Sequence, residues 1–349
     1  MSVPFSVKGQ HGSMPSSGFG TATLYNEVCE KAVIDAIRAG YRLIDTALLY
    51  NNQEAVGRGI RAAIASGLVT REELWVTSKV AFFPAAHDGK NAWVPIAWHA
   101  ENLKSEESVT SGVDLCLKLL GLDFVDLMLI HNPCTTLDDY TASSYPHCFE
   151  LGGSRLTTVE RELVLSHRFA SVKVDVAASE AVRAACWKAL ESARAAGKCR
   201  FIGVSNYSVP LLQAMEPYAN VMPAVNQLEL HPRFASPTLQ AYAAKAHLAL
   251  TAYGSGNSVK VEKSAVVSRI AATHGCSPTA IVLRWTLQKG IAVIPRTSKP
   301  EKMAENVRVL SSSPLSDAEM VALDALNEDH PYYWHPAPLV PYGTYVKDC

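Results

Sequence analysis

Four residues of this chain carry side chains that together could move a proton onto a carbonyl oxygen. Asp45, Lys79 and His131 each end a short, mainly apolar run, and the phenol of Tyr50 comes five residues after Asp45. An apolar run of this length is typical of a buried strand. When parallel strands end in a carboxylate, an ammonium and an imidazole, these groups gather at one end of the sheet, where a loop can aim a phenol at them.

The four groups fit the reduction of a carbonyl, which requires a hydride on carbon and a proton on oxygen. A free tyrosine, with a pKa near about 10, is a weak acid at neutral pH. We expect the ammonium of Lys79 to lower the pKa of Tyr50, and Asp45 to hold Lys79 in place and keep it charged. His131 would donate a hydrogen bond to the substrate oxygen while Tyr50 delivers the proton. In the alcohol-oxidising direction the same phenol would act as the base.

Apolar strands alternate with helical patterns along most of the chain. The first strand ends in Gly18-Phe-Gly-Thr21, and the pattern predicts further strands at residues 41–44, 74–78, 124–130, 200–204, 224–225, 248–252 and 291–295. Apolar residues at helical spacing predict helices at residues 27–39, 53–65, 107–120, 179–196, 265–274 and 278–289. This α/β alternation, with polar residues at one strand end, predicts a (β/α)8 TIM barrel. The alternative, an open doubly wound sheet, would need a glycine-rich phosphate turn, and Gly18-Phe-Gly-Thr21 lacks its third glycine.

The overall composition argues against several classes of protein. The 349 residues are 48% hydrophobic and carry a formal net charge of -1, with the basic residues scattered. We therefore expect no nucleic-acid partner and no membrane partner, since no apolar run approaches the roughly 18 residues of a membrane span. The eight cysteines contain no Cys-x-x-Cys pair, which predicts reduced thiols and a cytoplasmic protein. No His or Cys group has zinc-like spacing, so no metal site is expected.

In kind and order, Asp45, Tyr50, Lys79 and His131 match the catalytic tetrad of the aldo-keto reductases, and the chain resembles that family from about Gly18 to Leu326. The resemblance implies NADPH-dependent reduction of an aldehyde or ketone, with the four residues in the roles given above. It also implies a single domain over residues 1–349, in which a hairpin within residues 1–20 comes before the barrel and closes its bottom. The same resemblance implies a monomer that acts on a small-molecule carbonyl substrate.

The resemblance assigns the nicotinamide end of the cofactor to residues of the second half of the chain. Ser205, Asn206 and Gln227 would hydrogen-bond the carboxamide of the ring, and Tyr253 would stack on its face. Further expected contacts to the cofactor are, in chain order, Gly20, Thr21, Asp45, Gly254 and Ser255.

The phosphate and adenosine end of the cofactor is assigned to the segment 294–306. Arg296, Thr297 and Lys302 would meet the 2′-phosphate of NADPH, for which two cations and a hydroxyl are suitable partners. Glu305 and Asn306 would hold the adenine.

The sequence departs from the family pattern at four places. Arg296 replaces the usual lysine and Lys302 the usual arginine, so both charges survive and NADPH stays preferred over NADH, although Lys302 cannot stack on adenine as a guanidinium does. Gly254-Ser-Gly-Asn257 replaces a Ser-Pro-Leu-Gly loop, which predicts a looser hold on the pyrophosphate and faster cofactor exchange. Asn132 stands where many members have tryptophan, which would leave room for a bulkier or more polar substrate.

Two long connections leave the predicted catalytic end, over about residues 80–105 and 132–180, and an aromatic, proline-rich tail covers residues 328–349. For the connections, a lid over the substrate and surface decoration are both open interpretations. For the tail, the resemblance implies that it lines the mouth of the pocket, and packing on the flank of the barrel is the alternative. The barrel core would span about residues 18–326.

Two other functions stay open at this point. The same residues would serve an alcohol dehydrogenase that works with NADP in the oxidising direction. A non-catalytic, NADPH-binding regulatory subunit is the second alternative, against which the intact tetrad and the absence of a long basic or amphipathic docking arm both argue. The sequence does not identify the substrate.

Overall fold

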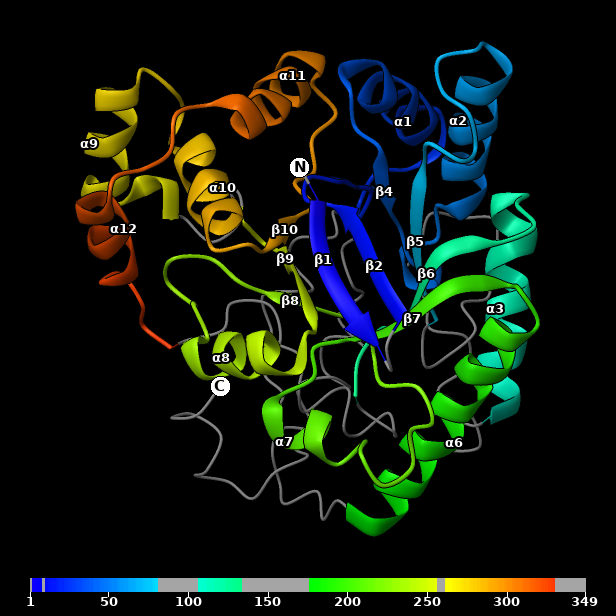
Figure 1. Ribbon diagram of the computed structural model, residues 1–349. Coiled ribbons are helices and arrows are strands. Elements are labelled where there is room, and N and C mark those ends of the chain that lie inside the picture. The colour runs from blue at the N-terminus through cyan, green and yellow to red at the C-terminus, as the bar shows by residue number, and fades with distance from the viewer. Residues whose placement is uncertain (1, 8–9, 81–105, 134–175, 256–260, 330–349) are drawn as a thin grey trace, which may run out of the picture.

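The computed structural model describes residues 2–7, 10–80, 106–133, 176–255 and 261–329 (Figure 1). Within them, an eight-stranded parallel sheet follows chain order from β3 to β10. Its strands are β3 (Phe19–Gly20), β4 (Leu43–Asp45), β5 (Trp75–Val80), β6 (Val125–Ile130), β7 (Cys199–Ser205), β8 (Val225–Glu229), β9 (Ala249–Tyr253) and β10 (Ala292–Val293). The sheet closes on itself, because Gly18 N donates to Val293 O at 2.8 Å and Gly20 N donates to Pro295 O at 3.1 Å. The predicted (β/α)8 barrel is confirmed.

Helices alternate with these strands and surround the barrel (Figure 1). They are α1 (Asn26–Ala39), α2 (Gln53–Ala65), α3 (Glu106–Leu120), α6 (Val176–Ala195), α7 (Val209–Gln213), α8 (Pro237–Ala246), α9 (Ala265–His274), α10 (Pro278–Gln288), α11 (Pro300–Arg308) and α12 (Asp317–Asp324), with the short 3-10 turns η1 (Leu48–Tyr50), η4 (Val261–Lys263) and η5 (Val309–Ser311). The bounds of α2 and α9 agree with the prediction, and α6 begins three residues earlier than the predicted residue 179.

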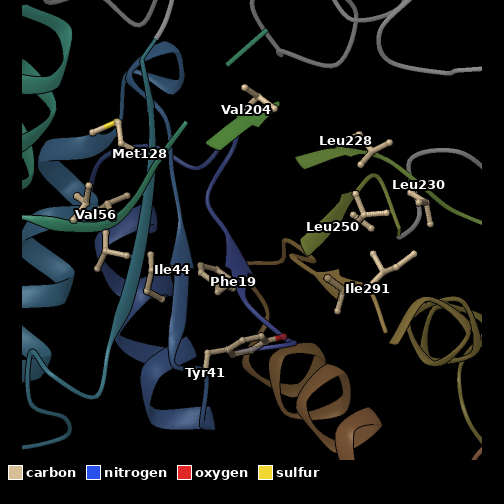
Figure 2. Close-up of a cluster of buried hydrophobic side chains, with 14 of the residues drawn as sticks. Phe19, Tyr41, Ile44, Val56, Met128, Val204, Leu228, Leu230, Leu250 and Ile291 are labelled. Atoms are coloured by element: carbon tan, nitrogen blue, oxygen red, sulfur yellow. The ribbon is translucent and has the colours of Figure 1, made fainter. Parts of the chain in front are cut away.

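Apolar side chains fill two separate layers of the fold. The larger cluster lies between strands and helices, and Figure 2 shows Ile44, Met128 and Leu250 from the strands in one cluster with Val56 of α2. A smaller cluster fills the inside of the barrel and consists of Met14, Leu43, Trp75, Leu127, Leu129, Ala224, Val225, Ala249, Ala292 and Ile294. Neighbouring residues of a strand, such as Leu43 and Ile44, belong to different clusters because successive side chains point to opposite faces.

A β-hairpin precedes the barrel, as predicted. Its strands β1 (Ser2–Val7) and β2 (Gln10–Pro15) pair antiparallel, and Figure 1 shows the hairpin lying across the barrel. Met14 of β2 is 1% exposed and belongs to the cluster inside the barrel. This cluster includes the first residues of β4, β5, β8 and β9, so the hairpin closes the amino-terminal end of the strands.

Strand boundaries differ from the prediction by a few residues, for identifiable reasons. Tyr41 is not in β4, because its N–H caps α1 by donating to Ala36 O at 3.0 Å. The ladder of β10 stops at Val293, two residues before the predicted residue 295, and Pro295 has no N–H to extend it. The longer β5 and β8 instead contain Lys79 and Gln227 within the sheet.

The interpretations of the two long connections and of the tail fall mostly on residues 81–105, 134–175 and 330–349, which lie outside the described residues. Among the helices that are described, none is long and apolar enough to cross a membrane.

Candidate active site

The two-residue period of the strands carries polar side chains into the upper part of the barrel. Asp45 comes two residues after Leu43, and Lys79 four residues after Trp75, so each has the same direction as a residue of the interior cluster. Both are almost completely buried, with 1% exposure for Asp45 and none for Lys79. The interior is therefore apolar at the amino ends of these strands and charged at their carboxyl ends.

Lys79 is the centre of this charged layer. Its Nζ donates to Asp45 Oδ1 at 2.5 Å, to the carbonyl oxygen of Thr46 at 3.0 Å and to the Tyr50 hydroxyl at 3.2 Å. Three acceptors match the three N–H groups of an ammonium, so the buried charge is fully hydrogen-bonded. The structure thus brings together the carboxylate, the ammonium and the phenol that the sequence singled out.

The pKa values of this group differ in one respect from the expectation. Burial alone would lower the pKa of Lys79, but the attraction of Asp45 and Tyr50 outweighs it, and the pKa is raised above its ordinary value. Burial also raises the pKa of Tyr50, and the opposing effect of Lys79 is smaller than the effect of burial. The expected lowering of the Tyr50 pKa is therefore wrong in sign, because the partial removal of the phenol from water has a larger effect than the nearby ammonium.

His131 lies next to the phenol at the end of β6. The backbone N–H of His131 donates to Val80 O at 3.2 Å, and this bond continues the pairing of β5 with β6. The imidazole and the Tyr50 ring meet edge to face, with 5.6 Å between ring centroids and 79° between planes. All four residues of the expected tetrad consequently lie within one neighbourhood.

Thr46 and Asn52 hold the loop that carries Tyr50, and neither residue is recognisable from the sequence pattern. Thr46 presents its carbonyl oxygen to Lys79, while its own N–H donates to Thr77 O at 2.9 Å. Asn52 accepts from Thr46 Oγ1 at 3.0 Å and donates to Thr21 O at 2.8 Å. An asparagine directly before a predicted helix suggests a cap. Its use in joining two loops depends on packing that the sequence does not display.

Gly20 and Thr21 connect Asp45 to the segment that contains Arg296. Gly20 is the register partner of Asp45, and Thr21 Oγ1 donates to the Asp45 carbonyl oxygen at 2.9 Å. A Cβ on Gly20 would lie 2.6 Å from Ile294 O, so only glycine permits this approach of β3 to the segment after β10. The chain before Arg296 thereby reaches the same end of the barrel as Asp45.

The residues expected at the nicotinamide form one hydrogen-bonded group. Ser205 Oγ donates to the Gln227 carbonyl oxygen at 2.7 Å, and the Tyr253 hydroxyl donates to Asn206 Oδ1 at 2.7 Å. Asn206 Nδ2 donates to His131 O at 3.0 Å and to Ser205 Oγ at 3.2 Å. The donors of Ser205 and Asn206 thus already have protein acceptors, and a carboxamide oxygen would have to displace one of them. Gln227 differs, because its Nε2 donates to Asp45 Oδ2 at 2.7 Å.

The residues expected at the phosphate and adenosine lie on α11 and just before it. Arg296 is exposed, and Lys302 Nζ contacts Glu305 Oε2 at 2.7 Å on the surface of α11. Burial alone would raise the pKa of Glu305, but hydrogen bonds from Lys302 and Ser277 lower it below its ordinary value. Asn306 is instead buried, with 6% exposure. It lies beside the Tyr41 hydroxyl, so it supports the packing of α11.

The remaining expected contacts are partly engaged within the protein. Thr297 Oγ1 accepts from Lys299 N at 3.1 Å, and the buried Ser255 Oγ donates to Leu230 O at 3.1 Å. Gly254 has a φ of 72°, a left-handed conformation that favours glycine. No group of three or more His, Cys, Asp or Glu side chains that could hold a metal ion occurs in the part of the chain that the structure describes.

Comparison with known proteins agrees with this arrangement. The model of the Aldo/keto reductase family matches residues 16–258 and 255–328. An NAD(P)H-dependent D-xylose reductase of Candida tenuis is 35% identical over 344 residues, which cover 93% of this chain and 95% of that protein. The NAD(P)H-dependent D-xylose reductase I,II of Candida tropicalis is 33% identical over 343 residues, with 93% and 94% covered.

Solved structures give the same result for the fold. The crystal structure of a Bombyx mori aldo-keto reductase in complex with NADP superimposes with a TM-score of 0.68 at 26% sequence identity. The match covers 92% of this chain and 91% of the other.

Proposed function

The chain belongs to the aldo/keto reductase family, and we propose that it reduces an aldehyde or ketone to the alcohol with NADPH as the hydride donor and Tyr50 as the proton donor. The observation that carries this proposal is the position of Lys79, whose ammonium contacts both Asp45 Oδ1 and the Tyr50 hydroxyl. The imidazole of His131 beside the same phenol supports it.

The residues present suit a nicotinamide cofactor. Gln227 Oε1 accepts no hydrogen bond from any residue that the structure describes, although Gln227 is only 2% exposed. A carboxamide N–H is a suitable donor for this oxygen. Tyr253, held by Asn206 at 2.7 Å, offers an aromatic face for the ring. When bound, the reduced nicotinamide supplies a hydride for the carbonyl carbon.

Tyr50, Lys79 and His131 divide the work of handling the carbonyl oxygen. His131 donates a hydrogen bond to that oxygen and orients it, and Tyr50 transfers its phenolic proton to it as negative charge develops there. The phenolate left behind lies next to the Lys79 ammonium, which stabilises it. Asp45 keeps Lys79 in position, so the proton donor can have a raised pKa and still be stabilised after it has lost its proton.

For the far end of the cofactor, we propose that Arg296, Thr297 and Lys302 contact the 2′-phosphate and that Glu305 contacts the adenine. The exposed guanidinium of Arg296 and the exposed ammonium of Lys302 support this, since a dianionic phosphate attracts two cations. Lys302 already pairs with Glu305, so we assign the larger part of the discrimination against NADH to Arg296.

We further propose that the chain acts as a single-domain monomer in the cytoplasm on a small-molecule carbonyl. D-xylose is the first substrate to test, because two relatives are named as D-xylose reductases. Oxidation of an alcohol with NADP uses the same residues, and the relative rates of the two directions distinguish the reductase from a dehydrogenase.

The test is consumption of NADPH, followed by absorbance, with D-xylose and a panel of aliphatic and aromatic aldehydes and ketones. Wild-type protein should turn over at least one of them, and Tyr50→Phe should lower kcat by about 10²–10⁴-fold with little change in NADPH affinity. A wild-type protein that binds NADPH and neither reduces a carbonyl nor oxidises an alcohol would favour the regulatory subunit. Full activity in Tyr50→Phe would refute the assignment of the proton donor.

A further inference from the structure

The contact between Gln227 and Asp45 joins two parts of the site that otherwise have separate tasks. Gln227 Nε2 lies 2.7 Å from Asp45 Oδ2, across the inside of the barrel and 182 positions apart in the chain. Asp45 Oδ1 binds Lys79, so each carboxylate oxygen has one partner. Both side chains are buried, with 1% exposure for Asp45 and 2% for Gln227. Loss of either hydrogen bond would therefore be costly, because solvent water cannot replace the missing partner at a buried position.

The chemistry of a carboxylate determines how the neighbouring amide must be oriented. An ionised carboxylate only accepts hydrogen bonds, whereas a glutamine amide has one accepting end and one donating end. The ammonium of Lys79 stabilises the ionised form of Asp45. Gln227 must consequently turn its NH₂ toward Asp45, because the opposite orientation would place two acceptor oxygens in contact at a buried position. The carbonyl end then faces away from Asp45.

We propose that Asp45 fixes the orientation of the Gln227 amide, so that Gln227 offers only a hydrogen-bond acceptor to the carboxamide of the nicotinamide. This inference rests on the proposed function, because it requires a bound nicotinamide cofactor. Asp45 then has two positioning roles, one toward Lys79 through Oδ1 and one toward Gln227 through Oδ2. The site recognises the NH₂ of the carboxamide, and a ring substituent that lacks this donor is bound less tightly.

The inference predicts how the protein distinguishes NADP from its 3-acetylpyridine analogue. The analogue keeps the carbonyl group and replaces the NH₂ with a methyl group, so it has no donor for Gln227 Oε1. Wild-type protein should bind NADP about tenfold more tightly than the analogue, the effect of one buried acceptor left unpaired. The dissociation constants are measured by isothermal titration calorimetry, which does not depend on turnover.

The decisive variant is Asp45→Asn, which keeps the shape of the side chain. Lys79 only donates, so the introduced amide turns its oxygen toward Lys79 and its NH₂ toward Gln227. Gln227 must then turn its carbonyl oxygen toward position 45, and its NH₂ can donate to the acetyl oxygen of the analogue. The preference for NADP should fall below about twofold. Tyr50→Phe is the matched control, because it also lowers activity and leaves the contacts of Asp45 with Lys79 and Gln227 unchanged. Its preference should remain at about tenfold.

The outcomes distinguish a failure of this inference from a failure of the proposed function. An unchanged preference in a folded Asp45→Asn protein overturns the inference and leaves the proposed function intact. Failure of the wild type to bind NADP at all overturns both. If Asp45→Asn does not fold, Gln227→Glu replaces it: the introduced carboxyl group needs a proton to face Asp45, so NADP affinity should fall as the pH rises through its titration. A pH-independent affinity in that variant would equally overturn the inference.

Discussion

Two buried carboxylates, Asp45 and Asp126, lie at opposite ends of the barrel and have different partners. Asp45 is the last residue of β4, and its oxygens contact two side chains, Lys79 and Gln227. Asp126 is near the start of β6, where its oxygens accept from the N–H of Val76 at 2.9 Å and from the guanidinium of Arg200 at 3.0 Å. It also forms an ion pair with Arg71. Both carboxylates are only 1% exposed, so the difference lies in the partners and not in the depth.

The partners of Asp126 join the amino ends of three neighbouring strands. Arg71 lies 2.9 Å from Asp126 and also donates to the carbonyl oxygens of Leu74 and Phe124. Arg71 and Arg200 both stack on the Phe124 ring, with guanidinium carbons 4.1 Å and 4.6 Å from its centroid. At this end of the barrel, charged side chains hydrogen-bond to the backbone and hold the strands together. This fits the rule that the amino ends of barrel strands serve stability and the carboxyl ends serve chemistry.

The largest expected effect is on kcat, and it shows whether the Asp45–Lys79 pair serves activity or stability. Lys79→Met leaves Asp45 as an uncompensated buried charge, so it should lower both kcat and the free energy of unfolding. Adding Asp45→Leu removes that charge and should restore most of the stability, while kcat stays about 10⁴-fold below wild type. Urea unfolding and NADPH consumption measure the two properties. A double variant less stable than Lys79→Met alone would show that the pair stabilises the fold.

At the other end, Asp126→Ala should lower the free energy of unfolding by about 3–5 kcal/mol, because two guanidiniums lose their carboxylate partner and a buried N–H loses its acceptor. The kcat of the folded protein should change little. Asp114→Ala is the control: it breaks an ion pair with Lys198 in which Asp114 is 54% exposed, and it should cost less than about 1 kcal/mol. Similar losses for the two variants would contradict the contrast between buried and surface charge.

The sequence predicted the positions of the strands and helices better than the contacts between the side chains of the site. Local patterns carry the strand–helix alternation, so α2 and α9 agree residue by residue with the prediction, and the strand ends that carry Asp45 and His131 are found within one or two residues. The fold class is confirmed for the same reason. The roles of the individual site residues stay predictions, since they depend on a bound cofactor and substrate.

The contacts that the sequence did not predict all depend on the register of distant strands or on depth. Gln227 meets Asp45 only because β8 and β4 face each other across a closed barrel. Asn306 lies beside Tyr41 because of its position on α11, and its expected contact with adenine stays a prediction. The sign of the Tyr50 pKa shift was missed because burial, which exceeds the influence of Lys79, is not visible in a loop sequence.

The carboxyl end of the barrel contains both the tetrad and the residues expected at the 2′-phosphate, and a third prediction tests the phosphate contact alone. Arg296→Ala should weaken NADPH binding by about 10–100-fold, because a charge-assisted contact with the 2′-phosphate is lost, and NADH binding by less than about twofold. Fluorescence titration of both cofactors measures this. Lys302→Ala is the comparison variant, and its effect should be smaller because Lys302 already pairs with Glu305. Equal losses of NADPH and NADH in Arg296→Ala would refute the phosphate contact.

The smallest expected effect concerns pH, and it tests the raised pKa values at the carboxyl end. Tyr50 must keep its proton to donate it, and its pKa is raised above the ordinary value of about 10. Lys79 is also shifted upward. The kcat for reduction should therefore change by less than about twofold between about pH 6 and pH 9, measured as initial rates at saturating NADPH.

The free energy of unfolding should also depend on the protons of Tyr50 and Lys79. The folded state holds the protons of Tyr50 and Lys79 more tightly than the unfolded chain does. Their contribution to the free energy of unfolding is thus complete below about pH 10 and is lost as the pH rises through the raised values. If the kcat for reduction instead falls with a midpoint near about pH 8, the pKa of Tyr50 is lowered. The Lys79 ammonium would then have a larger effect on that pKa than burial has.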